Sequence, residues 1–348
     1  MKKISIKNGR LIDPKHGLDA PRDLHLAEGK VAAITEPGKA PEGFADAHVI
    51  DAGGRIVCPG LVDLAAHLPG LEGELAAAVA GGVTSLAFPP DGRPPLDEPG
   101  LVERLVRRTA DAGLARVLPV GALTVGLKGE ALAELGSLAR AGCVAFSQGS
   151  NSPIVDTQVL LRALQYATTF GYTLFLQPQD KFLARDGVAH DGEVASRLGL
   201  PGIPAAAESV AIATALELVR STGARLHFTR LSSAAGVALL QRARDEGLPV
   251  SADIGIHHLH LTDMDIGYFD SAARFNPPLR AQRDREALAA AAASGLAAIC
   301  SDHTPIDEDG KALPFGEAEA GASALELLLP LTLKWAQDAR LPLATALA

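Results

Sequence analysis

The feature that most constrains this chain is a regular alternation of short apolar runs with longer segments of helical periodicity, which begins at Ile56. Short apolar runs are typical of buried strands, and amphipathic segments between them are typical of helices that connect parallel strands. Eight runs follow one another, namely IVCPGLVDL, VTSLAF, RVLPVGAL, CVAFS, YTLFLQ, RLHFT, LPVSADI and AAICS. Eight strands with intervening helices over roughly 250 residues predict an α/β fold of the (β/α)8 TIM-barrel type, whose chemistry lies at the carboxyl ends of the strands.

The segment that precedes the barrel has a different pattern. Between Ile4 and Ile50, runs of alternating polar and apolar residues are separated by Gly and Pro, which favours a small β-sheet. We therefore expect a partial β-sandwich module at residues 1–53 and the barrel at residues 54–348. The chain ends at Ala348 without strands that would complete the sandwich, so we expect that C-terminal strands are missing and that the gene product is longer.

Composition excludes several classes of function. The formal net charge of -9 disfavours nucleic acid and anionic membranes as partners, because both would repel the chain. The three cysteines show no CxxC spacing, so we expect neither a disulfide framework nor a thiolate zinc site. The N-terminus lacks the continuous apolar core of a signal peptide, and no long apolar run predicts a membrane span. We expect a cytoplasmic protein.

Several segments near the predicted strand ends carry a family resemblance. They are GGRIVCPGLVDLAAHLPG, AGGVTSLAFPPDGRPPLDEP, AGCVAFS, ARFNPPLR and CSDHTP. The combination of NPPLR with SDHTP in this order is more specific than either motif alone. On these motifs the chain resembles the amidohydrolase superfamily, and the dihydroorotases in particular, from about Lys3 to its C-terminus.

The resemblance implies a zinc site that this chain has lost. Active members hold one or two zinc ions through histidines and carboxylates, and the metal lowers the pKa of its bound water. Non-ligating residues stand at most of the corresponding positions, which are Ala65, Gln148, Gln177 and Arg230. His67 and Asp302 remain as relicts, which we place on opposite sides of the barrel mouth. Because even a catalytic zinc takes three protein ligands, we expect no catalytic residue, no metal and no cofactor.

The substrate side of the resembled site is altered as well. The family carries an arginine after its metal histidines, whereas here His67 and Leu68 run directly into Pro69. The asparagine expected after the second strand is replaced within the segment FPPD at residues 88–91. Asn276 and His258 remain as relicts of substrate-binding positions, so we expect no intact substrate site.

Two further hypotheses concern residues near the strand ends. The first is an unconventional metal site built from His67, His257 or His258, Asp302 and His303; we favour the simpler interpretation, in which His258 and His260 alternate as strand-end residues. Asp302 and His303 are adjacent, so their side chains should point to opposite faces. The second hypothesis is that Arg230 pairs with Asp302 and replaces the charge of the lost ion.

The resemblance finally implies a function. It favours a non-catalytic dihydroorotase-like subunit that assembles with and stabilises aspartate carbamoyltransferase in de novo pyrimidine biosynthesis, as a homo- or hetero-oligomer. One alternative is an active zinc-dependent dihydroorotase or related cyclic-amide hydrolase, with one zinc in a degenerate mononuclear site. Another is a small-molecule sensor that uses the emptied pocket.

Overall fold

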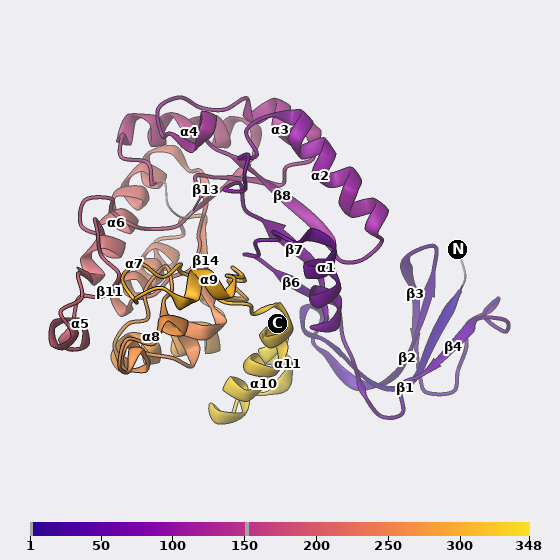
Figure 1. Cartoon of the computed structure of the whole chain (residues 1–348). Helices are drawn as coiled ribbons and strands as arrows, with labels where there is room; N and C mark the ends of the chain where they lie inside the picture. The colour runs from indigo at the N-terminus through magenta and orange to yellow at the C-terminus, as the bar shows by residue number, and fades with distance from the viewer. Residues whose placement is uncertain (1–2, 150–152) are drawn as a thin grey trace. The chain divides into compact units, whose positions relative to one another are not determined.

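The computed structural model describes residues 3–149 and 153–348, and it contains two compact units. Met1–Leu61 and Ala336–Ala348 belong to the first unit, and Val62–Trp335 form the second. Figure 1 traces the chain from its N-terminal sheet in indigo to the C-terminal helices in yellow. None of the described helices is long and apolar enough to cross a membrane.

The second unit is built on eight neighbouring parallel strands, which confirms the predicted barrel. In chain order, which is also their order around the sheet, they are β6 (Leu61–Asp63), β7 (Val83–Phe88), β8 (Arg116–Ala122), β9 (Ala145–Ser147), β10 (Thr173–Leu176), β13 (Arg225–Phe228), β14 (Val250–Gly255) and β15 (Ala298–Cys300). The ring closes just beyond its first and last strands, where the His67 amide donates to the His303 carbonyl at 2.8 Å. Each of the eight predicted apolar runs contains one of these strands, except that β14 extends one residue beyond its run, to Gly255.

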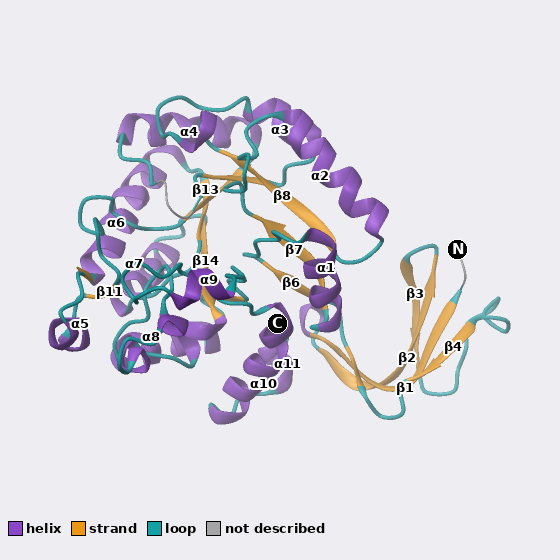
Figure 2. Ribbon diagram, viewed as in Figure 1, coloured by secondary structure: helices purple, strands orange, loops and turns teal. Residues whose placement is uncertain are grey.

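Helices cover the outside of the strands, as Figure 2 shows in purple and orange. The longer ones in this unit are α1 (Leu71–Ala80), α2 (Pro99–Ala112), α3 (Leu135–Ala141), α4 (Thr157–Phe170), α6 (Ala205–Thr222), α7 (Ala234–Asp245) and α8 (Gln282–Ala293). Shorter elements are α5 (Glu193–Leu198), α9 (Glu308–Ala312) and the strand pair β11 (Ala189–His190) and β12 (Gly202–Ile203). Helix α4 shows how local sequence sets these bounds: the Asp156 side chain accepts a hydrogen bond from the Gln158 amide, and Gly171 ends the helix in the left-handed region.

The first unit contains a five-stranded sheet in which β1 is central. Its strands are β1 (Ile4–Asp13), β2 (Leu18–Ala27), β3 (Lys30–Thr35), β4 (His48–Asp51) and β5 (Ile56–Val57). β2 lies antiparallel to β1, whereas β4 and β5 lie parallel to it. The first predicted apolar run is therefore divided, because Ile56 and Val57 join this sheet and only the residues from Leu61 onward enter the barrel. Helix α10 (Leu328–Asp338) leads to α11 (Leu343–Ala346) at the C-terminal end.

Asp63 links the first and last strands of the barrel. Its carboxylate is fully buried and accepts hydrogen bonds from the amide of Ser301, at 2.8 Å, and from the Ser301 hydroxyl. Burial outweighs these bonds and raises the pKa of Asp63 to about 6. The folded protein therefore retains a proton on Asp63 that the unfolded chain releases at lower pH.

The raised pKa predicts how stability changes with pH. Between pH 3.8 and about 6 the folded state binds more protons at Asp63 than the unfolded state, so this group lowers the free energy of unfolding as the pH rises. Asp63→Asn removes the titration while keeping an oxygen that accepts a hydrogen bond. We expect the urea midpoint of the wild type to fall relative to that of the variant between pH 4 and pH 6. Parallel midpoints over this range would contradict the assignment.

Candidate functional site

Arg230 lies at the mouth of the barrel. It follows β13, and its buried guanidinium donates from Nη1 to Asp302 Oδ1 at 3.0 Å and from Nη2 to Gln177 Oε1 at 2.6 Å. The expected ion pair between Arg230 and Asp302 is therefore confirmed. Both residues have left-handed backbone conformations, with φ of 57° and 49°. Such a conformation costs about 1 kcal/mol or more for a residue with a Cβ, so the surrounding contacts must hold both strand ends in place.

The ion pair controls the charge state of the site. Burial alone would raise the pKa of Asp302, but the charge of Arg230 and the contact with His257 outweigh it and lower this pKa to about 2. Burial alone would likewise lower the pKa of Arg230, but the charges of Asp302 and Asp91 raise it above its ordinary value. At neutral pH the site therefore contains a permanent cation in contact with a permanent anion.

His67, the other residue predicted at a ligand position, makes its own contacts. Its Nε2 lies 2.9 Å from Asp91 Oδ1, and its Nδ1 lies 3.1 Å from Thr304 Oγ1. The predicted placement of His67 and Asp302 on opposite sides of the mouth is wrong, because barrel closure brings the residues after β6 and β15 side by side. Although the two segments adjoin, His67 is turned toward the loop after β7 and Asp302 toward Arg230.

The two glutamines at predicted ligand positions, Gln148 and Gln177, form hydrogen bonds through their side-chain amides. Gln148 is buried, where its Oε1 accepts from the Thr124 hydroxyl and its Nε2 donates to the Leu127 carbonyl, both at 2.8 Å. Gln177 donates from Nε2 to Asn276 Oδ1 at 3.3 Å while its oxygen accepts from Arg230. Gln177 therefore connects Asn276 to the guanidinium of Arg230.

The histidine cluster differs from the prediction. His257 and His258 lie in a 3-10 turn, η3 (Ile256–Leu259), so the predicted strand-like alternation of His258 and His260 is wrong. The tight turn directs His257 Nε2 to 3.3 Å from Asp302 Oδ2, and the imidazole stacks on Phe275 with ring centroids 4.1 Å apart. His258 lies behind it, where burial, with the nearby His257, lowers its pKa to about 3.

His303 is directed away from Asp302, as expected for adjacent residues. Its Nε2 lies 2.8 Å from Glu74 Oε2, and its Nδ1 accepts a hydrogen bond from the Ala324 amide at 2.9 Å. Sequence reasoning did not single out Glu74, and it grouped His257 or His258 with Asp302 only in a hypothetical metal site. The HH dipeptide of GIHHLHLT was a signal for His257, but only the turn geometry shows which of the two imidazoles faces the carboxylate.

The residues at the mouth do not fit a zinc ion. Within residues 3–149 and 153–348, no three His, Cys, Asp or Glu side chains gather in an arrangement that would hold a metal. Asp302 is already neutralised by a guanidinium that cannot lose its proton. The cavity that Ala65, His67, Gln177 and Arg230 help to line has a volume of about 30 Å³, far below the roughly 300 Å³ of a small substrate pocket.

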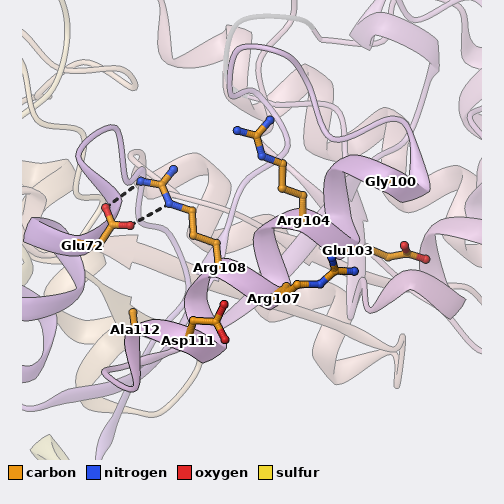
Figure 3. A pocket seen from close by; sticks show the side chains of 8 residues that line it. All are labelled: Glu72, Gly100, Glu103, Arg104, Arg107, Arg108, Asp111 and Ala112. Carbon is orange, nitrogen blue, oxygen red and sulfur yellow. Dashed lines mark hydrogen bonds and ion pairs between the residues drawn. The ribbon is translucent and has the colours of Figure 1, made fainter.

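A larger groove in this unit lies on the outer surface instead. It has a volume of about 510 Å³ and runs along α2, where Arg108 forms two hydrogen bonds of 2.8 Å with Glu72 (Figure 3). Its walls also present Arg104, Arg107, Glu103 and Asp111, so charges of both signs alternate along it. The groove therefore offers no field of one sign to a ligand, and it contains none of the site residues predicted from the sequence.

Comparisons with known proteins agree with this architecture. The Dihydro-orotase-like family matches residues 54–235. A dihydroorotase-like protein of Pseudomonas putida is 48% identical over 99% of this chain and 82% of its own length. A similarly named protein of Pseudomonas aeruginosa is 46% identical over 99% of this chain and 83% of its own length. A protein named dihydroorotase from Syntrophotalea carbinolica is 39% identical over 99% of this chain and 82% of its own length.

Solved structures extend the likeness to cyclic-amide hydrolases. An L-hydantoinase (dihydropyrimidinase) from Arthrobacter aurescens superposes with a TM-score of 0.84 at 25% identity, covering 99% of this chain and 80% of that one. A dihydroorotase from Saccharomyces cerevisiae, solved with 5-fluoroorotic acid, has a TM-score of 0.66 at 18% identity, with 82% and 81% covered. At that identity, the second structure supports the fold alone.

Proposed function

The chain belongs to the Dihydro-orotase-like family, and we propose that within it this protein is a non-catalytic subunit that assembles with and stabilises aspartate carbamoyltransferase. The observation that carries the first half of this proposal is the Arg230 guanidinium, which contacts Asp302 and Gln177 where the resemblance implies metal ligands. A fixed cation at this position opposes the binding of a second cation. Without a metal, no water with a pKa near 7 is available to attack a cyclic amide.

The second half of the proposal concerns why the barrel fold is kept although its reactive groups are replaced. Such a barrel still presents a surface to which another protein can bind. The family resemblance favours aspartate carbamoyltransferase as that partner. In this proposal a separate, active dihydroorotase supplies the hydrolase reaction in the same cell. The relatives that bear the name dihydroorotase make hydrolysis the alternative against which the proposal is tested.

The first experiment measures metal content and turnover together. The purified protein is dialysed in zinc-supplemented buffer and then in buffer alone, analysed for zinc, and assayed for dihydroorotate hydrolysis. We expect far less than one zinc per chain and no turnover above a buffer control. About one tightly bound zinc per chain with turnover would overturn the proposal, and His67 and Asp302 would then be the first residues to substitute.

The second experiment measures assembly. Aspartate carbamoyltransferase from the same organism is purified alone and mixed with this protein, and both samples are analysed by sedimentation velocity and thermal unfolding. We expect a faster-sedimenting complex and a higher midpoint for the carbamoyltransferase, because a partner that binds only the folded state stabilises it by mass action. Unchanged sedimentation at micromolar concentrations of both proteins would contradict the proposed partner.

A further inference from the structure

The main-chain amide of Arg230 has a different kind of acceptor from the amides beside it. Parallel strands satisfy one another's amides through carbonyl oxygens. The Thr229 amide follows this rule and donates to the Leu176 carbonyl at 3.0 Å. The Leu231 amide likewise donates to the Asp253 carbonyl at 2.9 Å. The Arg230 amide instead donates to a side chain, Asp253 Oδ1, at 2.7 Å. A carboxylate on β14 therefore replaces a carbonyl at the end of β13.

The left-handed conformation of Arg230 accounts for this change of acceptor. A φ of 57° turns the peptide out of the extended geometry in which a strand amide faces a neighbouring carbonyl. The hydrogen bond lies in the buried part of the barrel, since Arg230 is 7% exposed and Asp253 0%. A buried amide without an acceptor is strongly destabilising. The Asp253 carboxylate therefore makes this conformation possible for a buried residue with a Cβ.

The Asp253 carboxylate is itself fixed by groups from β13 and β15. His227 Nε2 lies 2.9 Å from Asp253 Oδ2, and His227 Nδ1 lies 2.8 Å from the Ser251 hydroxyl. The Cys300 thiol donates to Asp253 Oδ1 at 3.3 Å. Burial, with the charges of the nearby carboxylates, raises the pKa of this thiol well above its ordinary value, so the thiol keeps its proton. Both carboxylate oxygens of Asp253 are therefore engaged.

Two buried carboxylates thus hold Arg230 at two points. Asp253 binds its main chain, and Asp302 binds its guanidinium at 3.0 Å. The direction in which a side chain leaves the main chain depends on the backbone conformation of its own residue. The conformation that Asp253 maintains therefore also sets the direction of the Arg230 side chain, whereas Asp302 acts only on its tip.

We propose that Asp253 is a positioning residue, which holds the Arg230 amide and thereby keeps the guanidinium where the resemblance implies metal ligands. This inference rests on the proposed function, because it assigns the residue on which the fixed cation of the mouth depends. Asp253 acts through Arg230 and not directly on a ligand. Without its carboxylate, the strand end is free to return to an extended conformation, and the guanidinium loses its place between Asp302 and Gln177.

The test measures hydrogen exchange of single main-chain amides by NMR in the wild type and in Asp253→Ala. The amides of Thr229 and Leu231 donate to carbonyls that the substitution leaves in place, so they report any general loss of stability. We expect exchange at Arg230 to accelerate roughly tenfold or more relative to these two neighbours, as for the loss of one buried hydrogen bond. A merely structural role for Asp253 would accelerate all three amides together.

Two further variants and a second readout sharpen the test. Asp253→Asn keeps an oxygen that accepts a hydrogen bond, so exchange at Arg230 should stay close to that of the wild type. Ser251→Ala removes the hydroxyl contact of His227 and keeps the Asp253 carboxylate, so it is the matched control. The Nη–H protons of Arg230 exchange slowly while Asp302 and Gln177 hold them, and their signals should be lost in Asp253→Ala alone.

The outcomes separate this inference from the function on which it rests. If Arg230 exchanges in step with its neighbours in folded Asp253→Ala, or keeps its guanidinium signals there, the positioning role is overturned and the proposed function stands. If Asp253→Ala does not fold, the wild type provides the test: deuterium at the Arg230 amide should shift the Asp253 carboxyl carbon resonance, and no shift overturns the inference. Retained zinc with turnover in the wild type overturns the proposed function, whatever the exchange rates are.

Discussion

Arg230→Met is expected to lower the free energy of unfolding by about 3–5 kcal/mol, the range found when one partner of a buried ion pair is removed. The substitution leaves the Asp302 carboxylate, which is 5% exposed, without its cation, and leaves Gln177 Oε1 without its donor. Urea unfolding at pH 7 measures the loss. Because the pKa of Asp302 is held at about 2 by this pair, the stabilisation should disappear as the pH falls from 3.8 toward 2.

Two further variants show whether the loss comes from an uncompensated charge. The double variant Arg230→Met/Asp302→Asn removes both charges and should recover at least half of the stability, since a neutral pair has a much smaller desolvation penalty. Arg108→Met breaks an ion pair on the surface, where both side chains are more than half exposed, and should leave the urea midpoint unchanged. A single variant as stable as the wild type would show that the ion pair is not structurally important.

The triple variant Ala65→His/Gln177→His/Arg230→His is expected to retain about one zinc per chain after dialysis, whereas the wild type is expected to retain far less. The substitutions remove the guanidinium and place three imidazoles at positions where the resemblance implies ligands, around the retained Asp302. Three or four such ligands meet the minimum for a protein zinc site. Elemental analysis and a zinc-dependent rise in the thermal midpoint measure the gain.

The matched control retains the cation. Ala65→His/Gln177→His keeps Arg230 and its bond to Asp302, so it should bind zinc far more weakly than the triple variant although it carries two of the three added imidazoles. Circular dichroism establishes that both variants fold. If the folded triple variant releases its zinc as readily as the control, these positions do not converge on one point and the assignment of lost ligands is wrong.

Much of the fold could be predicted because its signals are local. Each apolar run that was assigned to a barrel strand contains one, since burial on both faces requires a continuous apolar stretch in a parallel sheet. The division of the first run between β5 and β6 was missed, because Ile56 and Leu61 have the same local character and differ only in which strand they pair with. Pairing partners are distant in the sequence and leave no local signal.

The site was predictable in its residue types and less so in its geometry. The absence of ligating side chains at Ala65, Gln177 and Arg230 follows from residue identity alone, and the pairing of Arg230 with Asp302 was expected from opposite charge. The hydrogen-bond partners of His67 were not expected, because Asp91 and Thr304 come from other loops. The contact of His257 with Asp302 depends on a 3-10 turn where an extended strand end was expected.

By itself, the sequence determined the repeating strand-and-helix pattern, the family resemblance and the residue types at Ala65, Gln177 and Arg230, because each is a property of residue type and order along the chain. Only the tertiary structure decided that the residues after the first and last strands adjoin, that Arg230 bridges Asp302 and Gln177, and that His257, not His258, contacts the Asp302 carboxylate. The physical reason is that barrel closure and the burial of a charge both depend on residues that are distant in the sequence. Their outcome depends on which distant strand ends meet, and on whether a charge that leaves water finds a partner there.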